Sequence, residues 1–375
     1  MAMYFGVNNI AQKVKALYIG VDGVAHKVKQ AFIGVGGVAS KLFGGELTYK
    51  GTAKALAKAR FGLSATNAGD YALFGGGRDL SSYYTNVDAY SPSLTMSSLS
   101  GFTAKLSQRS ATSVGGSAMF GCGYNGSSAY RFADVYNSSL SKEGLVTLSK
   151  ARYDLSATSV GNYALFGGGY DGSARSAVVD AVNVNLTAST PTVLSVARAE
   201  LGATTIAGNA IFAGGTSGNP VDTVDVYDAS LTRTNPTSLS VKRRLLGSAK
   251  VGGYALFAGG HGYQAENVVG ALAVVDAFNS SLTRSNPTAL STARSTMGCT
   301  SVGDYAVFAG GSERLDQSFV VDAYDASLTR TVLPDLSKSR ENLAGATTGD
   351  YALFGGGLNK DTDEVFSTVD VYQCA

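Results

Sequence analysis

The stretch LSATSVGNYALFGGG, residues 155–169, holds the pattern that decides the fold of this chain. Its first half, residues 155–160, is rich in small and β-branched residues, and its second half, residues 163–166, is Tyr-Ala-Leu-Phe. Gly161 and Asn162 between the halves suit the positive φ angles of a tight hairpin turn. The stretch therefore predicts two short antiparallel strands that end in a run of glycines.

The same phrase, an aromatic residue followed by small ones, returns at nearly constant spacing. The aromatic positions are Phe74, Phe120, Phe166, Phe212, Phe257, Phe308 and Phe354, spaced by 46, 46, 46, 45, 51 and 46 residues. Each unit continues with a variable loop, a third strand such as residues 87–90, a polar turn and a fourth strand. The fourth strands are expected to begin at Leu94, Leu140, Leu186, Leu231, Leu282 and Leu328. Seven such units without a helical period predict an all-β, seven-bladed β-propeller.

The ring is expected to close with a strand from the other end of the chain. The last unit stops just after its third strand, at residues 371–375, so its fourth strand is missing. The segment that begins at Leu47 has the missing pattern, and it resembles the segment that begins at Leu328. We predict that residues 46–54 complete the seventh blade, which removes an open sheet edge. The propeller domain would then span residues 46–375.

Residues 1–45 carry a different repeat, of 14 residues, in which Gly6, Gly20 and Gly34 align. Two-residue turns at 8–9, 22–23 and 36–37 predict a module of three β-hairpins. A module of this size is marginal as an isolated domain. It should therefore pack on the propeller, on another copy of the chain or on a larger assembly. An attachment or oligomerisation role is favoured, and the alternative is a structural cap on the propeller.

Composition excludes several classes of protein. The net charge is +2, which gives no domain-wide footprint for nucleic acid, although residues 1–43 hold a charge of +4. The three cysteines, Cys122, Cys299 and Cys374, have neither disulfide-framework nor zinc-site spacing. No apolar run is long enough to span a membrane, and the first residues do not read as a secretory signal. We expect synthesis in a cytoplasm, with no membrane, metal or cofactor.

An arginine and an aspartate recur once per unit. The arginine lies 14 residues before the aromatic at Arg60, Arg152, Arg198, Arg243, Arg294 and Arg340, and the second unit has Lys105-Leu106 instead. The third strands carry Asp88, Asp134, Asp180, Asp225, Asp276, Asp322 and Asp370. One interpretation is a ring of cations that binds an anion at the channel mouth. The other is a structural Arg–Asp pair, which the matching repetition favours.

Sequence variation is concentrated in the loops between second and third strands, which should share one propeller face with the segments that enter each first strand. These loops are residues 78–86, 124–132, 170–177, 216–222, 261–273, 312–319 and 358–367. Tyrosine and arginine dominate binding hot spots and antibody-like surfaces. The predicted ligand- or partner-binding residues are Tyr83, Tyr84, Tyr124, Tyr130, Arg131, Tyr170, Arg175, His261, Tyr263, Glu266 and Arg314. The alternative is that these are ordinary solvent-facing loops.

Catalysis is not expected from the sequence. His26 and His261 are the only histidines, and they lie in different parts of the chain. The carboxylates follow the repeat, so no acid/base pair stands out. The glycine runs precede neither a helix nor a Lys-Ser/Thr pair and are not phosphate loops. We therefore predict a binding protein that is not an enzyme and has no catalytic residues.

The glycines after the second strand and the aromatic residue in the third strand resemble kelch repeats over roughly residues 46–375. The third-strand aromatic residues are Tyr90, Tyr136, Tyr227, Tyr324 and Tyr372, with Phe278 and Val182 as variants. The tryptophan of kelch units is absent, and a leucine in the Ser-Leu-Thr phrase takes its place. The resemblance implies a kelch-like propeller and does not carry over the function of any particular kelch protein.

The repeated phrases, such as Ser-Leu-Thr-Arg, also resemble propeller proteins encoded by phages and prophages of Gram-positive hosts. That resemblance implies a component of a virion or tail-like particle, with the loops recognising a host surface receptor or glycan. Residues 1–45 would then bind other virion or tail proteins. Two alternatives stay open: a structural decoration or adaptor subunit, and a carbohydrate-active enzyme.

Overall fold

The structure, a computed structural model, describes residues 4–7, 10–13, 17–21, 24–28, 30–35, 38–263, 269–313 and 316–374, with side chains from residue 45 onward. The regular secondary structure within these residues consists of β-strands alone. The predicted site residues Glu266 and Arg314 lie outside the described residues, and so do the three predicted hairpin turns.

Seven antiparallel sheets in the described part of the chain have four strands each, and we call them blades 1 to 7. Blade 1 contains β8 (Ser64–Ala68), β9 (Tyr71–Gly75), β10 (Val87–Tyr90) and β11 (Met96–Ser98), and blade 2 contains β12 (Ser110–Val114), β13 (Ser117–Gly121), β14 (Phe132–Tyr136) and β15 (Lys142–Thr147). Blade 3 contains β16 (Ser156–Val160), β17 (Tyr163–Gly167), β18 (Val179–Asn183) and β19 (Ala188–Ser189), and blade 4 contains β20 (Gly202–Ile206), β21 (Asn209–Ala213), β22 (Val224–Tyr227) and β23 (Arg233–Thr234). Blade 5 contains β25 (Gly247–Val251), β26 (Tyr254–Ala258), β29 (Val275–Asn279) and β30 (Arg284–Ser285), and blade 6 contains β31 (Gly298–Val302), β32 (Tyr305–Ala309), β33 (Val321–Asp325) and β34 (Arg330–Leu333). Blade 7 contains β35 (Ala344–Thr348), β36 (Tyr351–Gly355), β39 (Val369–Cys374) and β7 (Leu47–Thr52).

The remaining strands form smaller sheets. Three of them pair in the loop region of blade 5, namely β24 (Arg243–Arg244), β27 (His261–Tyr263) and β28 (Val269–Ala271), and two pair in blade 7, namely β37 (Leu358–Asn359) and β38 (Glu364–Val365). The N-terminal strands pair as β1 (Tyr4–Val7) with β2 (Ile10–Lys13), β3 (Leu17–Val21) with β4 (Val24–Val28), and β5 (Gln30–Val35) with β6 (Val38–Gly44).

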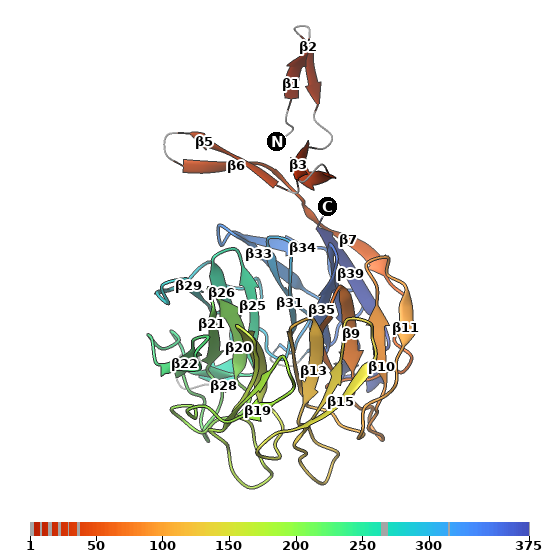
Figure 1. The fold of residues 1–375 in the computed structure, drawn as a ribbon, viewed down its shortest axis with the longest axis vertical. Helices are drawn as coiled ribbons and strands as arrows, with labels where there is room; N and C mark the ends of the chain where they lie inside the picture. Colours follow the sequence, from red (N-terminus) through yellow and green to blue (C-terminus); the bar gives the residue numbers. More distant parts are fainter. Residues whose placement is uncertain are drawn as a thin grey trace.

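The blades pack face to face because their middle strands are apolar on both sides. In blade 3, Ala164, Leu165 and Phe166 have no exposed surface, and the second strand of every blade shows the same burial. The first strands touch in a closed cycle that runs from β8 through β12, β16, β20, β25, β31 and β35 back to β8. The result is a ring of sheets around one axis (Figure 1), and the predicted all-β propeller architecture is confirmed.

The ring is joined across its ends by β7 and β39, which lie side by side in Figure 1. They pair antiparallel, with Tyr49 opposite Tyr372 and Leu47 opposite Cys374. The Tyr49 hydroxyl also donates a 2.7 Å hydrogen bond to the Asp370 carboxylate. Blade 7 therefore takes its outer strand from the start of the propeller and its other three from the end of the chain.

The repeated leucine of the Ser-Leu-Thr phrase lies outside the strands, and each of the predicted fourth-strand starts is two residues too early. Leu94, for example, has φ of 60° and belongs to a turn, whereas β11 begins at Met96. Its side chain packs against the apolar core between blades 7 and 1. The leucine therefore packs the turn against the core. Burial of its apolar side chain offsets the free-energy cost of its left-handed backbone conformation.

Alternation of strand direction places two kinds of connection on the two ends of the ring. The loops between second and third strands and the linkers between blades lie at one end, which we call the loop face, where Phe61 pairs with Arg78 and Tyr153 with Tyr170. The short hairpin turns, the start of β7 and the end of β39 lie at the opposite end. Figure 1 shows long loops projecting from the end of the ring opposite to the C-terminus. Residues 1–44 therefore join the propeller on the side away from the loop face.

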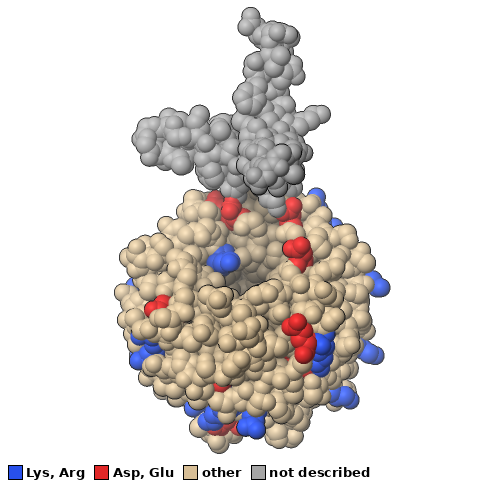
Figure 2. Space-filling model, viewed as in Figure 1, with Lys and Arg blue, Asp and Glu red and all other residues tan. Residues whose placement is uncertain are grey.

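The surface carries few charges. In the view of Figure 2, Lys, Arg, Asp and Glu are scattered singly or in small mixed groups over an otherwise uncharged surface that is hollowed near its centre. The residues that the structure describes include no helix long and apolar enough to cross a membrane. Recognition on this surface would therefore rest on individual groups rather than on a broad field of one sign.

Candidate functional site

The repeated arginine and aspartate form a buried ion pair in every blade. The seven pairs are Arg60–Asp88, Arg109–Asp134, Arg152–Asp180, Arg198–Asp225, Arg243–Asp276, Arg294–Asp322 and Arg340–Asp370. Six of the seven arginines have no exposed surface. Each aspartate also accepts a hydrogen bond from a backbone N–H of the linker that enters its blade. The pairs tie linkers to blades and present no cation ring to a ligand.

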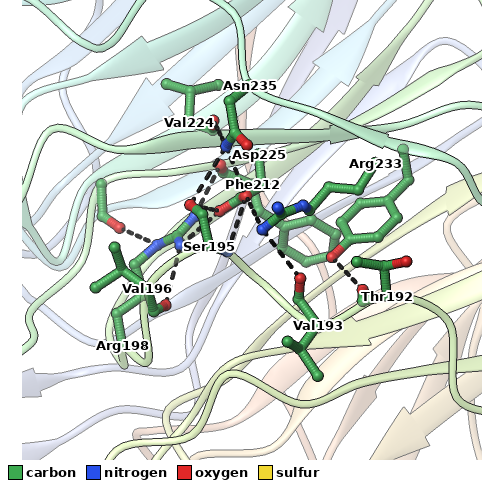
Figure 3. A network of polar contacts seen from close by, with 12 residues as sticks. Thr192, Val193, Ser195, Val196, Arg198, Phe212, Val224, Asp225, Arg233 and Asn235 are labelled. Carbon is green, nitrogen blue, oxygen red and sulfur yellow. Dashed lines mark hydrogen bonds and ion pairs between the residues drawn. The ribbon is translucent and has the colours of Figure 1, made fainter.

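Blade 4 shows the complete network (Figure 3). The Arg198 guanidinium donates to Asp225 at 2.7 Å and to the backbone oxygens of Val196, Phe212 and Gly214 at 3.2, 3.2 and 2.9 Å. A second arginine, Arg233, reaches the other oxygen of the same carboxylate at 3.3 Å and is 24% exposed. Burial lowers the pKa of Arg198, and the Asp225 carboxylate opposes that shift. Most N–H donors of the buried guanidinium are therefore hydrogen-bonded.

Blade 2 replaces the missing arginine from a different sequence position. Arg109, only 11 residues before Phe120, donates to the Phe120 carbonyl and forms a 2.8 Å ion pair with Asp134. Its guanidinium lies 4.2 Å from the centroid of the Phe102 ring. Leu106 is buried at the usual arginine position, so the apolar and charged residues have exchanged places. The repeat pattern does not reveal this compensation, because Arg109 lies outside the aligned arginine position.

A collar of seven residues surrounds the axis at the loop face, each lying two positions after the repeated arginine site. They are Gly62, Gln108, Asp154, Glu200, Leu245, Thr296 and Asn342. All seven have φ between 52° and 60°. For each collar residue except Asp154, the backbone N–H donates to the equivalent carbonyl of the preceding blade at 2.8–3.2 Å, for example from Glu200 to Asp154 and from Leu245 to Glu200. A left-handed backbone is unusual for side-chain-bearing residues, and such positions cluster at functional sites.

The collar side chains differ from blade to blade. The collar residues Gln108, Asp154 and Glu200 form a polar cluster together with Arg244, which directly precedes the collar residue of blade 5. The Gln108 amide donates to the Asp154 carboxylate at 3.0 Å, and Arg244 donates to the Glu200 carboxylate at 2.7 Å. The backbone of Arg244 lies opposite that of His261 where β24 pairs with β27. The Nδ1 atom of His261 is buried without a hydrogen-bond partner. The described residues contain no cluster of His, Cys, Asp and Glu suited to a metal ion.

The two collar carboxylates occupy different electrostatic surroundings. Burial raises the pKa of Asp154 to about 7, with a further rise from the negative charge of Glu200 and an opposing effect of the Gln108 hydrogen bond. Glu200 has the Arg244 guanidinium as its partner. Burial, followed by the charge of Arg244, lowers the pKa of His261. Near neutral pH, Asp154 can therefore hold or release a proton beside Glu200, which acid–base chemistry requires.

The Asp154→Asn substitution should change how stability depends on pH. The folded state binds more protons than the unfolded state between about pH 4 and pH 7, so the free energy of unfolding falls as pH rises through that window. The asparagine variant should lose less, and should gain about 1–3 kcal/mol over the wild type at pH 8. Asn342 already occupies the equivalent position with φ of 54°, so asparagine fits this backbone. Denaturant unfolding at pH 5 and pH 8 checks this, and equal pH dependence in both proteins would contradict it.

Three tyrosines stack beside the collar. The ring centroids of Tyr124 and Tyr153 are 4.6 Å apart, and those of Tyr153 and Tyr170 are 5.6 Å apart in an edge-to-face arrangement. We call these residues the tyrosine stack. It joins the loops of blades 2 and 3 to the linker that carries Asp154. Two predicted site residues, Tyr124 and Tyr170, are thus brought together by Tyr153, which the sequence analysis did not select.

Tyr83 and Tyr130 lie in a pocket between blades 1 and 2, with a volume of about 480 Å³. We call it the inter-blade pocket, and it is lined by Ser81, Ser82, Tyr83, Ala104, Lys105, Asn125 and Tyr130. Its size falls within the range of small-molecule sites. The pocket opens between neighbouring loops of the loop face.

The other described candidates take separate places. Tyr84 donates to Asp79 in its own loop, and Tyr263 donates to Asn219 of the adjacent blade at 3.3 Å. Arg131 is exposed, and Arg175 is half-buried where its backbone bridges Tyr170. These four residues do not join the collar cluster or line the inter-blade pocket.

Gln108, Asp154, Glu200 and Arg244 were missed because the sequence analysis treated carboxylates as repeat-bound and looked for variation in loops. A signal was nevertheless present. The two residues after each repeated arginine differ in every unit, although the residues around them recur. Variation inside an otherwise regular phrase, rather than loop length, marks the collar.

Comparison with solved structures agrees with the architecture. The protein described in "Structure of YjhT" aligns with a TM-score of 0.58 and 11% sequence identity, covering 75% of this chain and 99% of that one. The chain has the β-propeller fold. At this identity the likeness shows the fold alone. No model of a known protein family matches the chain, and no curated protein matches it either.

The same comparison corrects one expectation. The prediction that the chain is not an enzyme rested on its fold and on missing motifs, and the likeness to the YjhT propeller contradicts that prediction. A ring of blades like this one is therefore compatible with catalysis. The prediction of a non-enzyme is wrong, because neither the fold nor the missing motifs exclude an enzyme. The carboxylates at Asp154 and Glu200 also do not follow the repeat, contrary to the argument that no acid/base pair could be singled out.

Proposed function

We propose that the loop face of this kelch-like propeller is a recognition surface for a receptor or glycan on a host cell. In this proposal the chain is a component of a phage or tail-like particle. Residues 1–45 bind other particle proteins on the opposite side of the ring, and self-association through that segment is one form of the attachment. The protein is made in the host cytoplasm and then assembled into the particle.

The proposal rests on one contrast: the side chains that repeat are buried in the scaffold, and the side chains that do not repeat lie at the loop face. Within each blade the repeated Arg, Asp, Tyr and Phe side chains are buried and hold the scaffold together. At the loop face the side chains become unequal from blade to blade, with the tyrosine stack beside the Gln108–Asp154 and Glu200–Arg244 contacts. Aromatic faces next to convergent polar groups suit sugars and polar protein loops.

Alanine substitution of the tyrosine stack should remove binding without unfolding the ring. We expect Tyr124→Ala and Tyr153→Ala to weaken adsorption to host cells, or binding to a glycan panel, by about tenfold each. Tyr254→Ala is the matched control, because Tyr254 is half-buried at the start of a second strand and lies at the end of the ring opposite to the loop face. Glycan-array and cell-adsorption measurements on the purified proteins check this.

Other outcomes of the same experiment assign other functions. Equal losses in Tyr254→Ala and the stack variants would contradict a loop-face site. A particle that adsorbs normally without this protein would assign it a structural decoration or adaptor role. Release of sugar products from the panel, abolished by Asp154→Asn, would assign a carbohydrate-active enzyme that uses the collar carboxylates.

A further inference from the structure

We infer that the inter-blade pocket binds the anionic group of an acidic saccharide, with Lys105 as the charged contact. The inference rests on the proposed recognition role of the loop face and specifies the class of ligand. In the sequence, Lys105 stands out only because Lys105-Leu106 interrupts the arginine repeat.

The pocket presents mostly hydrogen-bond donors. The Tyr130 hydroxyl accepts a 3.1 Å hydrogen bond from the Asn125 amide, which leaves its own O–H free to donate to a ligand. The side-chain oxygen of Asn125 is already engaged by the N–H groups of Ser127 and Ser128 at 2.9 and 2.8 Å. Tyr83 contributes a second hydroxyl and an aromatic face. A ligand rich in acceptors, such as a carboxylate, sulfate or phosphate ester on a sugar, complements this lining.

Lys105 is the one charged residue among those that line the pocket. Its side chain is exposed, and the ion pairs found among the described residues do not include it. By contrast, Lys142, Lys150 and Lys360 each contact a carboxylate. An ammonium group without a carboxylate partner, at the wall of a donor-lined pocket, is available to an anion.

The acidic side chain of the blade 1 loop, Asp79, is already hydrogen-bonded within that loop. Asp79 accepts hydrogen bonds from the Tyr84 hydroxyl and from the backbone N–H groups of Ser81 and Ser82. These donors, the Tyr84 hydroxyl first, lower the pKa of Asp79 to about 2. The carboxylate is therefore ionised at neutral pH and hydrogen-bonded within its own loop, and Asp79 is not among the residues that line the pocket.

The matched control is provided by the repeat. Lys242 lies directly before Arg243, the position equivalent to Lys105 in blade 5, and it is also exposed. Lys105→Ala and Lys242→Ala remove the same charge from the same repeat position in two different blades. Both changes are on the surface, so neither should alter folding.

The probes are oligogalacturonate, dextran sulfate and a teichoic-type glycerol-phosphate oligomer, with neutral dextran as reference, titrated into the full chain by calorimetry at low and physiological salt. The three acidic probes distinguish carboxylate, sulfate and phosphate as the source of the charge. We expect at least one of them to bind, Lys105→Ala to weaken it by about tenfold, and Lys242→Ala to leave it unchanged. The affinity should fall as salt rises, because the contact is ionic.

The failures are distinguishable. Binding of neutral glycans alone, or equal binding of an acidic probe to the wild type and Lys105→Ala, would overturn the pocket assignment and leave loop-face recognition standing. Equal losses in Lys105→Ala and Lys242→Ala would show a diffuse charge effect and also overturn it. If no saccharide or cell surface binds the wild type, the proposed function fails together with this inference.

Discussion

Arg198→Ala should destabilise the propeller by about 3–5 kcal/mol, because it leaves the Asp225 carboxylate in the interior without its main cation. Asp225 has no exposed surface, and the lost guanidinium also served the carbonyls of Val196, Phe212 and Gly214. Chemical denaturation, followed by far-UV circular dichroism, measures the loss as a lower midpoint. The change lies within blade 4, so local unfolding of that blade should precede loss of the ring.

The control is the second arginine of the same network. Arg233→Ala removes a contact to the same carboxylate, but Arg233 is 24% exposed and its Nη1 atom lies 3.3 Å from the carboxylate oxygen. We expect a loss of about 1 kcal/mol or less for this variant. Similar losses for the two substitutions would mean that burial does not determine how much the ion pair contributes to the free energy of unfolding. The structural interpretation of the repeated arginine would then fail.

Removal of β7 should have a still larger effect than any single substitution. A variant that begins at Ala53 lacks the outer strand of blade 7, which exposes the backbone edge of β39 and the side chain of Tyr372. Unpaired strand edges invite association. We expect a loss of more than about 5 kcal/mol together with concentration-dependent aggregation, measured by thermal unfolding and light scattering.

A variant that begins at Glu46 is the matched control for the β7 truncation. It lacks the hairpin strands β1 to β6 but keeps β7, so it should unfold at nearly the temperature of the full chain. The difference between the two truncations isolates the closing strand. Equal stability of both variants would show that the ring does not depend on the β7–β39 pairing.

The scaffold was largely predictable because each blade repeats a local pattern. The glycine turns, the apolar second strands and the third-strand aromatic residues indicate hairpins and buried sheets directly. The segment starting at Leu47 was expected to supply an outer strand, and β7 pairs with β39. The fourth strands were placed too early, because the repeated leucine takes a left-handed turn conformation that its residue type does not suggest.

The candidate site was only partly predictable. Tyr124, Tyr170 and His261 were selected from their loops and do lie beside the collar, whereas Tyr84 and Tyr263 bond elsewhere. Asp154 and Glu200 were hidden among carboxylates that follow the repeat. Arg109 was hidden because a guanidinium can reach the same partners from a backbone position three residues away.

The amino-acid sequence alone determined the repeating unit, the all-β class and the strand available for closing the ring, because turns and strand periodicity depend on residues close together in the chain. Only the tertiary structure decided which non-repeating side chains meet at the axis. Gln108, Asp154 and Glu200 lie 46 residues apart along the chain and become neighbours when the blades close into a ring. Their proximity, and the electrostatic interaction between the Asp154 and Glu200 carboxylates, follow from that closure rather than from any local pattern.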